Sequence, residues 1–549
     1  MENSFYGALC NDEVSPSETH ALNAFAVGDP CSFSNTNYNC GRSNDTGTTL
    51  SPADCLSRCT KSSILPFDMD EEFPGGRKYD SWVGIAEEGE KGKQLAVYSE
   101  EEKDRDELSQ LFDNLYFNHS VDDGRLKKQM PHPKSVFVSR VLKRQKTDIL
   151  MAVELENLLV HCGRAVGEDD RRTAHELLNQ IRKYSSPFGN GVQRCAHYFA
   201  IGLEARLAGT TKPYESTLGS KLQSAADLLK AYEGFRWVCP FRPAIFHFAR
   251  HSILNLAHKA STLHIVDFGI NDGLGWVHVI KDLSNTPNGA PRLRITGVDC
   301  PRQVEWQMKL VTQTGSRLSS YCQRVGVPFE YNCVMTHNWD KIPVEDFKIG
   351  QNESVVVVCM LGFESCLDEG DWARCPKDGI LALIRKMNPN IFVHAVSNAD
   401  LSVPMFSSRF LKSLYHYLAY FDLIDAVFRQ DNQDRLWVEN DLLGRPIFNL
   451  IACEGVERVV RTEGASRWEG RTKSVGFQQL PLDKKLMQVL GLMLKHQYHK
   501  DYMLVENGRW MALGWKGRSL QTICCWRPKS SLTHGVQGIS PYLHRSVAR

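Results

Sequence analysis

Leu263-His264-Ile265-Val266-Asp267-Phe268-Gly269-Ile270-Asn271-Asp272-Gly273-Leu274-Gly275-Trp276 is the stretch that decides the fold. It begins with an apolar run, which predicts a buried strand, and glycines follow at three of the next positions. A strand, a glycine-bearing turn and a helix, in this order, open many nucleotide-binding α/β domains. About thirty residues later, 293–299 is again an apolar run that ends in an acidic residue. The two runs together predict a Rossmann-like, methyltransferase-like core.

Further apolar runs follow, with room for a helix between most of them. They predict strands at 263–268, 293–298, 328–334, 354–361, 390–396, 446–453 and 519–526, and helices at 301–325, 376–387, 405–420 and 481–496. Continuous apolar strands that alternate with helices are typical of a mostly parallel sheet covered on both faces. The last two predicted strands flank a long helix, and we expect them to pair antiparallel at one edge.

Helical periodicity begins near residue 149, upstream of the first strand. Apolar residues follow a helical spacing through 149–166, and Asp169-Asp170 can cap a second helix. Further helices are predicted at 191–208, 221–233 and 241–258. We therefore expect a domain over 148–528 with a mainly helical cap at 148–260 and an α/β core at 261–528. Residues 529–549 form a C-terminal tail in this scheme.

The first 147 residues differ from the rest in composition and charge. Residues 1–110 hold 21 acidic and 9 basic side chains, a net charge of −12, so residues 111–549 carry +13. Scattered apolar residues without a period predict a disordered regulatory region. Residues 125–146 hold eight Lys and Arg side chains. A bipartite nuclear signal could use Lys127, Lys128, Lys143, Arg144 and Lys146, although a solvated linker would have the same composition.

Several classes of protein are disfavoured by the sequence. No run reaches the roughly 18 apolar residues that a membrane helix needs, so we expect no membrane partner. The 17 cysteines follow no regular spacing, which argues against a disulfide framework and against a metal site. No nucleophile–base arrangement stands out, and we predict no catalytic residue.

The glycine-bearing turn has two interpretations. Asp267, Gly269 and Gly273 could hold a ribose-bearing cofactor whose hydroxyls reach Asp299. Alternatively, the glycines only permit a tight turn between strand and helix. Asn271 adds bulk where a cofactor must approach. We therefore expect the second interpretation, with no cofactor and with the Asp267 carboxylate accepting backbone N–H bonds from the turn.

Ordered blocks across roughly 150–528 resemble the plant GRAS family, and most of all its scarecrow-like branch. Leu155-Glu156-Asn157-Leu158-Leu159-Val160-His161-Cys162 looks like the opening of the first leucine-rich region, and 311–350 looks like the second. Leu263-His264-Ile265-Val266-Asp267 is similar to the VHIID motif. Two further regions of the family have counterparts in this sequence. The residues that resemble the PFYRE region are Pro389, Phe406, Glu457, Arg458 and Arg461. Those that resemble the SAW region are Trp510, Trp515, Lys516, Arg518 and Trp526. Residues 271–276 depart from the aromatic segment usual in the family.

The resemblance implies a helical cap on a Rossmann-like core, no catalysis and no cofactor. It also implies a nuclear regulator of transcription that binds DNA, partner transcription factors or both, as a homodimer or heterodimer. Two alternatives stay open: an S-adenosylmethionine-dependent small-molecule methyltransferase, and a partner scaffold that does not touch DNA. The DNA site, the pathway and the direction of regulation are not specified by the sequence.

Three groups of residues are candidates for contacts with partners. The candidate DNA contacts are basic side chains, which would bind phosphates: Arg458, Arg461, Arg467, Arg471, Lys516 and Arg518. Trp510, Trp515 and Trp526 could stack on bases, but we expect them in the core. Leu155, Leu158 and Leu159 match a helix-in-groove pattern and also the core face of a helix. The cap that carries these leucines is the candidate dimer or partner surface.

Overall fold

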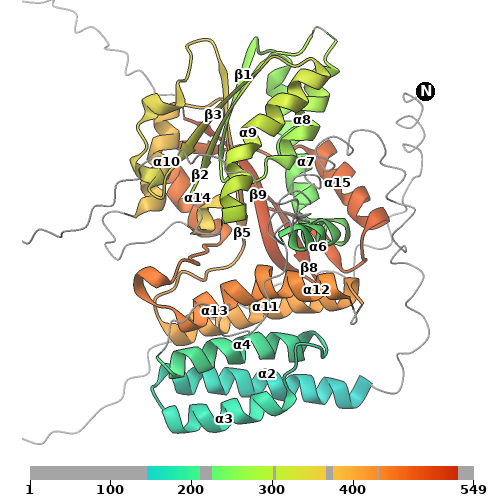
Figure 1. Ribbon diagram of the computed structural model, residues 1–549, viewed down its shortest axis with the longest axis vertical. Helices are drawn as coiled ribbons and strands as arrows, with labels where there is room; N and C mark the ends of the chain where they lie inside the picture. The colour runs from blue at the N-terminus through green and yellow to red at the C-terminus, as the bar shows by residue number, and fades with distance from the viewer. Residues whose placement is uncertain are drawn as a thin grey trace, which may run out of the picture. The chain divides into compact units, whose positions relative to one another are not determined.

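The structure is a computed structural model that describes residues 145–209, 225–287, 289–300, 305–365, 375–429 and 432–529 (Figure 1). The disordered region expected at 1–147 lies outside the described residues up to residue 144, and the expected tail lies outside them from residue 530. Four of the nuclear-signal residues, Lys127, Lys128, Lys143 and Arg144, therefore lie outside the described part. Within the described residues, no helix is both long and apolar enough to cross a membrane.

A mostly parallel sheet forms the centre of the domain. Its parallel strands are β1 (Thr262–Phe268), β2 (Arg292–Asp299), β3 (Phe329–Met335), β4 (Ser354–Met360) and β5 (Ile391–Ser397). The antiparallel strands are β6 (Phe477–Gln479), β7 (Tyr502–Asn507), β8 (Trp510–Trp515) and β9 (Arg518–Pro528). The order is β3-β2-β1-β4-β5-β9-β8-β7, and β6 pairs with β9. The predicted Rossmann-like core is confirmed.

Each face of the sheet has its own hydrophobic core, because successive side chains of a strand point to opposite faces. On β1, Leu263 and Ile265 belong to one core, whereas Val266 and Phe268 belong to the other. The first core is covered by helices α7 (Phe241–Ala257), α8 (Leu274–Ser284), α9 (Glu305–Val325) and α15 (Lys484–Gln497). The second is covered by α10 (Pro376–Met387) and α14 (Ala465–Ser474).

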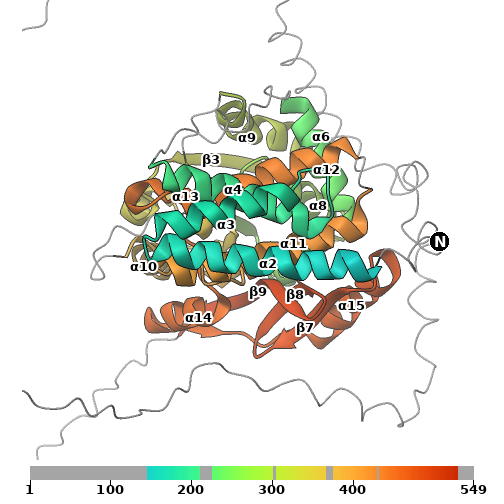
Figure 2. The same ribbon diagram turned by 90° about the horizontal axis from the view of Figure 1, so that it is seen from below.

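A layer of helices lies against the first of these cores. It contains α2 (Gln145–Gly167), α3 (Arg171–Tyr184) and α4 (Gly191–Leu207), which the sequence predicted. It also contains α11 (Phe406–Val427), α12 (Gln433–Val438) and α13 (Arg445–Ala452), which come from the second half of the chain and pack on α4 and α6 (Ala225–Val238). Figures 1 and 2 show α2, α3 and α4 stacked against α11 and α13. Helices after β5 thus complete the predicted cap.

Short helices complete the description. The 3-10 helices are η3 (Trp339–Lys341), η4 (Val344–Phe347), η5 (Gly362–Ser365) and η7 (Gly455–Glu457), and η6 (Glu439–Gly444) is a π-helix.

The strand predicted at 446–453 is wrong, because these residues form α13. Its buried residues Ile447, Phe448, Leu450 and Ile451 follow the spacing of one helix face. Ile451 packs where α4 has Gly202, whose added Cβ would lie 2.9 Å from the Cβ of Ile451. The antiparallel edge is instead formed by β6 to β9, of which only β9 was predicted.

Candidate functional site

The glycine-bearing turn that follows β1 is held by hydrogen bonds to the end of β2 and within the turn. The Oδ2 atom of Asp299 accepts the backbone N–H of Asn271 at 3.0 Å, and its Oδ1 atom accepts that of Cys300 at 2.8 Å. Gly269 and Gly273 have φ values of +94° and +66°, a region that favours glycine. Asn271 has a φ of +48°, and its side-chain amide donates to the carbonyl of Gly269 at 2.7 Å. The turn is thereby fixed by these hydrogen bonds.

These contacts use a group that a nucleoside cofactor would need. The carboxylate of Asp299, which would receive ribose hydroxyls, already accepts two backbone N–H groups of the protein. Gly275 lets α8 pack closely on α7, since an added Cβ there would lie 1.8 Å from the ring of Phe246. The glycines serve the turn and the packing of α8 on α7.

Asp267 is buried and accepts a hydrogen bond from the indole Nε1 of Trp276 at 2.8 Å. The expectation that its carboxylate accepts backbone N–H bonds of the turn is therefore wrong, and Asp299 has that role. Burial raises the pKa of Asp267 to about 7, and the nearby carboxylates of Asp299 and Asp272 act in the same direction. The indole N–H and Arg242 oppose this shift.

The other residues of 263–267 hold the strand in place. His264 is fully buried, and its ring nitrogens contact the carboxylate of Glu353 at 3.1 Å and the hydroxyl of Thr296 at 2.9 Å. Burial lowers the pKa of His264, which favours the neutral ring at pH 7. His264 therefore links β1 to β2 and to the residue before β4, as expected for a core histidine.

The sequence pattern of the GRAS domain family matches residues 155–527. The chain belongs to this family. Scarecrow-like protein 14 of Arabidopsis thaliana is 42% identical over 457 residues, covering 80% of this chain and 58% of that protein. Scarecrow-like protein 31 of the same plant is 40% identical and covers 80% of this chain and 63% of that protein. The chain thus aligns with less than two thirds of the length of either relative.

A solved structure agrees with the GRAS assignment. The crystal structure of SCL7 in Oryza sativa superposes with a TM-score of 0.58 and 27% sequence identity. The match covers 68% of this chain and 99% of that one. In this GRAS domain the VHIID-like residues Leu263, His264, Ile265, Val266 and Asp267 are all buried.

The tryptophans of the SAW-like region lie in the GRAS core. Trp510, Trp515 and Trp526 are each at most 2% exposed, so none of them can stack on a base without unfolding. The indole of Trp515 donates to Asp422 of α11 at 2.6 Å. The expectation of a core role is confirmed.

The leucines of the first leucine-rich region are also internal. Leu155 and Leu159 are at most 2% exposed in the chain's own core, and Leu158 packs partly buried against it. The helix-in-groove interpretation of these residues is therefore wrong, because leucine side chains that insert into a partner's groove must be exposed on the free protein.

Two of the predicted DNA contacts are buried. Arg458 and Arg461 are 5% and 8% exposed. Arg461 donates to the carbonyls of Arg458 at 3.0 Å and Gly455 at 2.6 Å, so it holds the loop after α13. The prediction that these arginines meet phosphates is wrong, since both side chains are buried within the domain.

The remaining four basic residues have different environments. Arg471 binds both oxygens of Glu463, at 2.8 and 3.1 Å, and Asp378 at 2.7 Å. Arg467 is exposed and lies 3.4 Å from Asp400, and Lys516 is exposed and lies 2.7 Å from Asp422. Arg518 is exposed over the ring of Tyr415. Arg467, Lys516 and Arg518 are therefore accessible to an anionic partner, and Arg471 is held by internal carboxylates.

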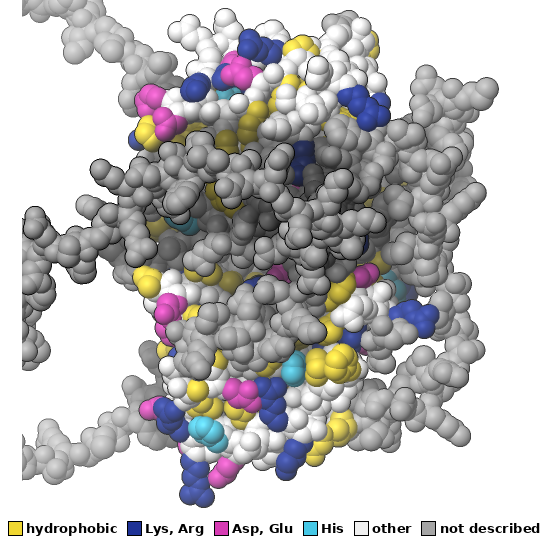
Figure 3. Space-filling view, in the orientation of Figure 1, with side chains coloured by type: hydrophobic (Ala, Val, Ile, Leu, Met, Phe, Trp, Pro, Cys, Tyr) yellow, Lys and Arg dark blue, Asp and Glu magenta, His cyan; other side chains and the backbone are white. Residues whose placement is uncertain are grey.

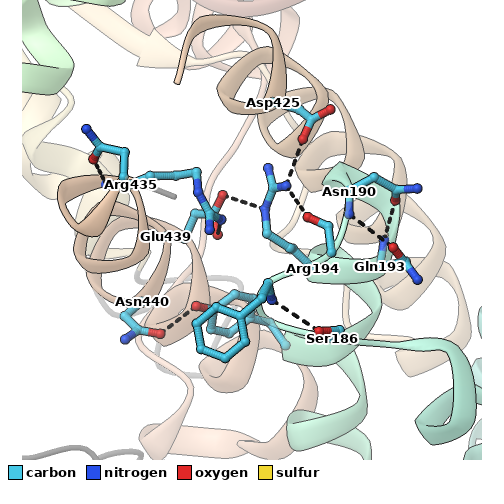
Figure 4. A network of polar contacts seen from close by, with 12 residues as sticks. Ser186, Asn190, Gln193, Arg194, Asp425, Arg435, Glu439 and Asn440 are labelled. Carbon is cyan, nitrogen blue, oxygen red and sulfur yellow. Dashed lines mark hydrogen bonds and ion pairs between the residues drawn. The ribbon is translucent and has the colours of Figure 1, made fainter. Parts of the chain in front are cut away.

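The sequence analysis missed a buried ionic network between α4 and η6 (Figure 4). Arg194 is fully buried and contacts Glu439 at 2.9 Å and Asp425 at 2.7 Å. Glu439 is also fully buried and accepts from Arg435 at 2.8 Å. The sequence did contain a signal for this network: Arg194 lies on the apolar face of the helix predicted at 191–208. A charged side chain that is buried there needs a partner of opposite charge.

Proposed function

We propose that this chain is a nuclear regulator of transcription without enzymatic activity. The observation that carries the proposal is the Asp299 carboxylate, which accepts the backbone N–H groups of Asn271 and Cys300, in a domain that belongs to the GRAS family. A methyltransferase needs a donor site at this turn, and ribose hydroxyls there would have to share the Asp299 carboxylate with two backbone N–H groups. Thermal stabilisation of the protein by S-adenosylmethionine would contradict the proposal.

The second part of the proposal concerns contact with DNA through a group of four exposed cations, here called the basic edge: Lys412, Arg467, Lys516 and Arg518. Lys412, Tyr415 and Asp422 share one face of α11 by their spacing. Lys516 pairs with Asp422, and Arg518 lies over Tyr415. Lys516 and Arg518, which are about one hundred residues away in the sequence, therefore lie along the same face of α11 as Lys412.

Asp400 and Asn398 join Arg467 to the same region. Asp400 lies 3.4 Å from Arg467 and 3.9 Å from Lys412. Asn398 accepts from the backbone N–H of Ala465 and donates to the hydroxyl of Ser519, next to Arg518. Phosphates could replace the two exposed aspartates as partners of these cations, which supports sequence-independent contact.

An electrophoretic shift of the full chain on duplex DNA across a salt series tests the basic edge. Arg467→Gln, Lys516→Gln and Arg518→Gln together should weaken binding and flatten the salt dependence by roughly three counterions. The control carries Arg172→Gln, Arg292→Gln and Lys473→Gln, which change exposed cations outside the basic edge. Binding that does not depend on salt, or no binding, would favour a scaffold that recruits partner transcription factors.

Dimerisation and the binding of partner transcription factors are proposed from membership of the GRAS family alone. The face of the described residues seen in Figure 3 carries basic and acidic side chains interspersed over the helical layer, which gives no single-sign surface there. Light scattering after gel filtration of the full chain gives the oligomeric state. A monomer at micromolar concentration would remove the dimer from the proposal.

A further inference from the structure

A cavity of about 610 Å³ lies beside the glycine-bearing turn. Its lining includes Asp267 and Trp276, Tyr232 of α6 and Phe246 of α7. Leu442 of the π-helix η6 also lines the cavity, and the hydroxyl of Tyr232 donates to the neighbouring Asp441. A cavity of this size, lined mainly by apolar and aromatic side chains with a few polar groups, is typical of a small-molecule site.

The polar groups of the cavity differ in what already binds them. Asp272 accepts the backbone N–H of Leu274 at 3.0 Å and lies 3.6 Å from Arg242, so these two charges offset each other. The Oδ2 atom of Asp267 accepts from Trp276, whereas no described residue donates to its Oδ1 atom. Asp267 is thus a buried carboxyl group with one oxygen available to a ligand.

We propose that this cavity binds a small organic amine with an aromatic or apolar body, whose ammonium group donates to Asp267. A buried carboxylate is stabilised by a charged donor, and an ammonium group is also attracted to the faces of aromatic rings such as those that line the cavity. A carboxylate ligand is disfavoured, since Asp267 would repel it and Arg242 already has Asp272. A nucleoside is disfavoured by the contacts of Asp299. The inference does not depend on DNA or partner binding.

Two indole probes of equal length test the proposal by isothermal titration calorimetry of the full chain. Tryptamine carries an ammonium group, and 3-indolepropionate carries a carboxylate at the corresponding position. We expect tryptamine to bind at least roughly tenfold more tightly, the factor expected for a charge-assisted hydrogen bond. No binding of tryptamine up to millimolar concentration, or equal binding of both probes, would overturn the proposal.

Matched variants locate the amine. Asp267→Asn keeps an oxygen for the indole of Trp276 but replaces the charge, and it should weaken tryptamine roughly tenfold or more. Asp282→Asn, a carboxylate of α8 that pairs with Arg250 outside the cavity, should leave the affinity unchanged. Leu442→Trp narrows the cavity without touching Asp267 and should weaken both probes. Unaltered tryptamine affinity in Asp267→Asn, with a folded variant, would contradict the assignment.

The pH dependence separates ionic binding from simple apolar burial. Burial raises the pKa of Asp267 to about 7, with Asp299, Asp272 and Arg242 as the charged groups that face it. An amine stays protonated over this range, so tryptamine affinity should rise severalfold between pH 6 and pH 8. The rise should be absent in Asp267→Asn. Tighter binding of S-adenosylhomocysteine than of tryptamine would replace the amine by a nucleoside ligand and revive the methyltransferase.

Discussion

Arg194 of α4 and Glu439 of η6 form an ion pair in which both side chains are fully buried, with 2.9 Å between Nε and Oε1. The two residues are 245 positions apart in the chain. The pair therefore connects the helical layer formed before the sheet to helices that follow β5. Arg435 and Asp425 complete the charge balance (Figure 4).

Glu439→Gln should destabilise the GRAS domain strongly, because it leaves two arginines in the interior with less negative charge. Breaking a buried pair by removing one partner costs about 3–5 kcal/mol. Urea unfolding followed by circular dichroism measures this loss. Glu176→Gln, which breaks the exposed pair with Arg172, is the control and should cost less than about 1 kcal/mol. Similar losses in both variants would show that the network has no special role.

Asp267→Asn should change how stability depends on pH. In the folded protein the pKa of Asp267 is raised to about 7 from the model-compound value of 3.8. Between these values Asp267 binds more protons in the folded state than in the unfolded state, so its contribution to wild-type stability falls as pH rises from 4 to 7. The asparagine variant lacks this term, which amounts to on the order of 4 kcal/mol. Its free energy of unfolding relative to wild type should therefore increase with pH, and a constant difference would contradict the raised pKa.

The parallel half of the sheet was predictable because its strands are buried on both faces. Val355 to Met360 are apolar without interruption. A short apolar run of this kind between helices is typical of a strand buried on both faces of a parallel sheet. The run at Ile447–Ile451 is interrupted only by Asn449, but it forms a helix. A short apolar segment does not distinguish the two states, and its packing against Gly202 of α4 decides between them.

The site was less predictable than the fold, because its polar contacts depend on where backbone groups lie. The sequence placed Asp267 and Asp299 at the ends of neighbouring strands, which the structure confirms. It did not show which carboxylate accepts the backbone N–H groups of the turn. Arg461 was likewise expected to contact DNA, although its guanidinium donates to the carbonyl oxygens of Gly455 and Arg458.

Replacing the five basic residues of the expected nuclear signal should shift the protein toward the cytoplasm. The change is Lys127, Lys128, Lys143, Arg144 and Lys146 to Gln, and the motive is their bipartite spacing in a basic segment. Quantitative imaging of a fluorescently tagged full chain measures the nuclear fraction. Replacing Lys91, Lys93 and Lys103 is the control. An unchanged distribution in the first variant would leave nuclear import to a partner.

Arg461→Gln should weaken DNA binding only by destabilising the fold. Substitutions in the basic edge should instead weaken DNA binding without destabilising the fold. Its guanidinium donates to the carbonyl oxygens of Gly455 and Arg458, and losing these hydrogen bonds, of which the one to Arg458 is buried, costs about 1–3 kcal/mol. Lys516→Gln changes an exposed cation whose pair with Asp422 contributes less than about 1 kcal/mol.

Thermal unfolding and DNA titration of the Arg461→Gln and Lys516→Gln variants should therefore give opposite results. Arg461→Gln should melt earlier yet bind normally at temperatures where it stays folded, whereas Lys516→Gln should melt normally and bind with a smaller salt dependence. If Arg461→Gln loses affinity while fully folded, its guanidinium contacts DNA after a rearrangement of the loop at 455–461.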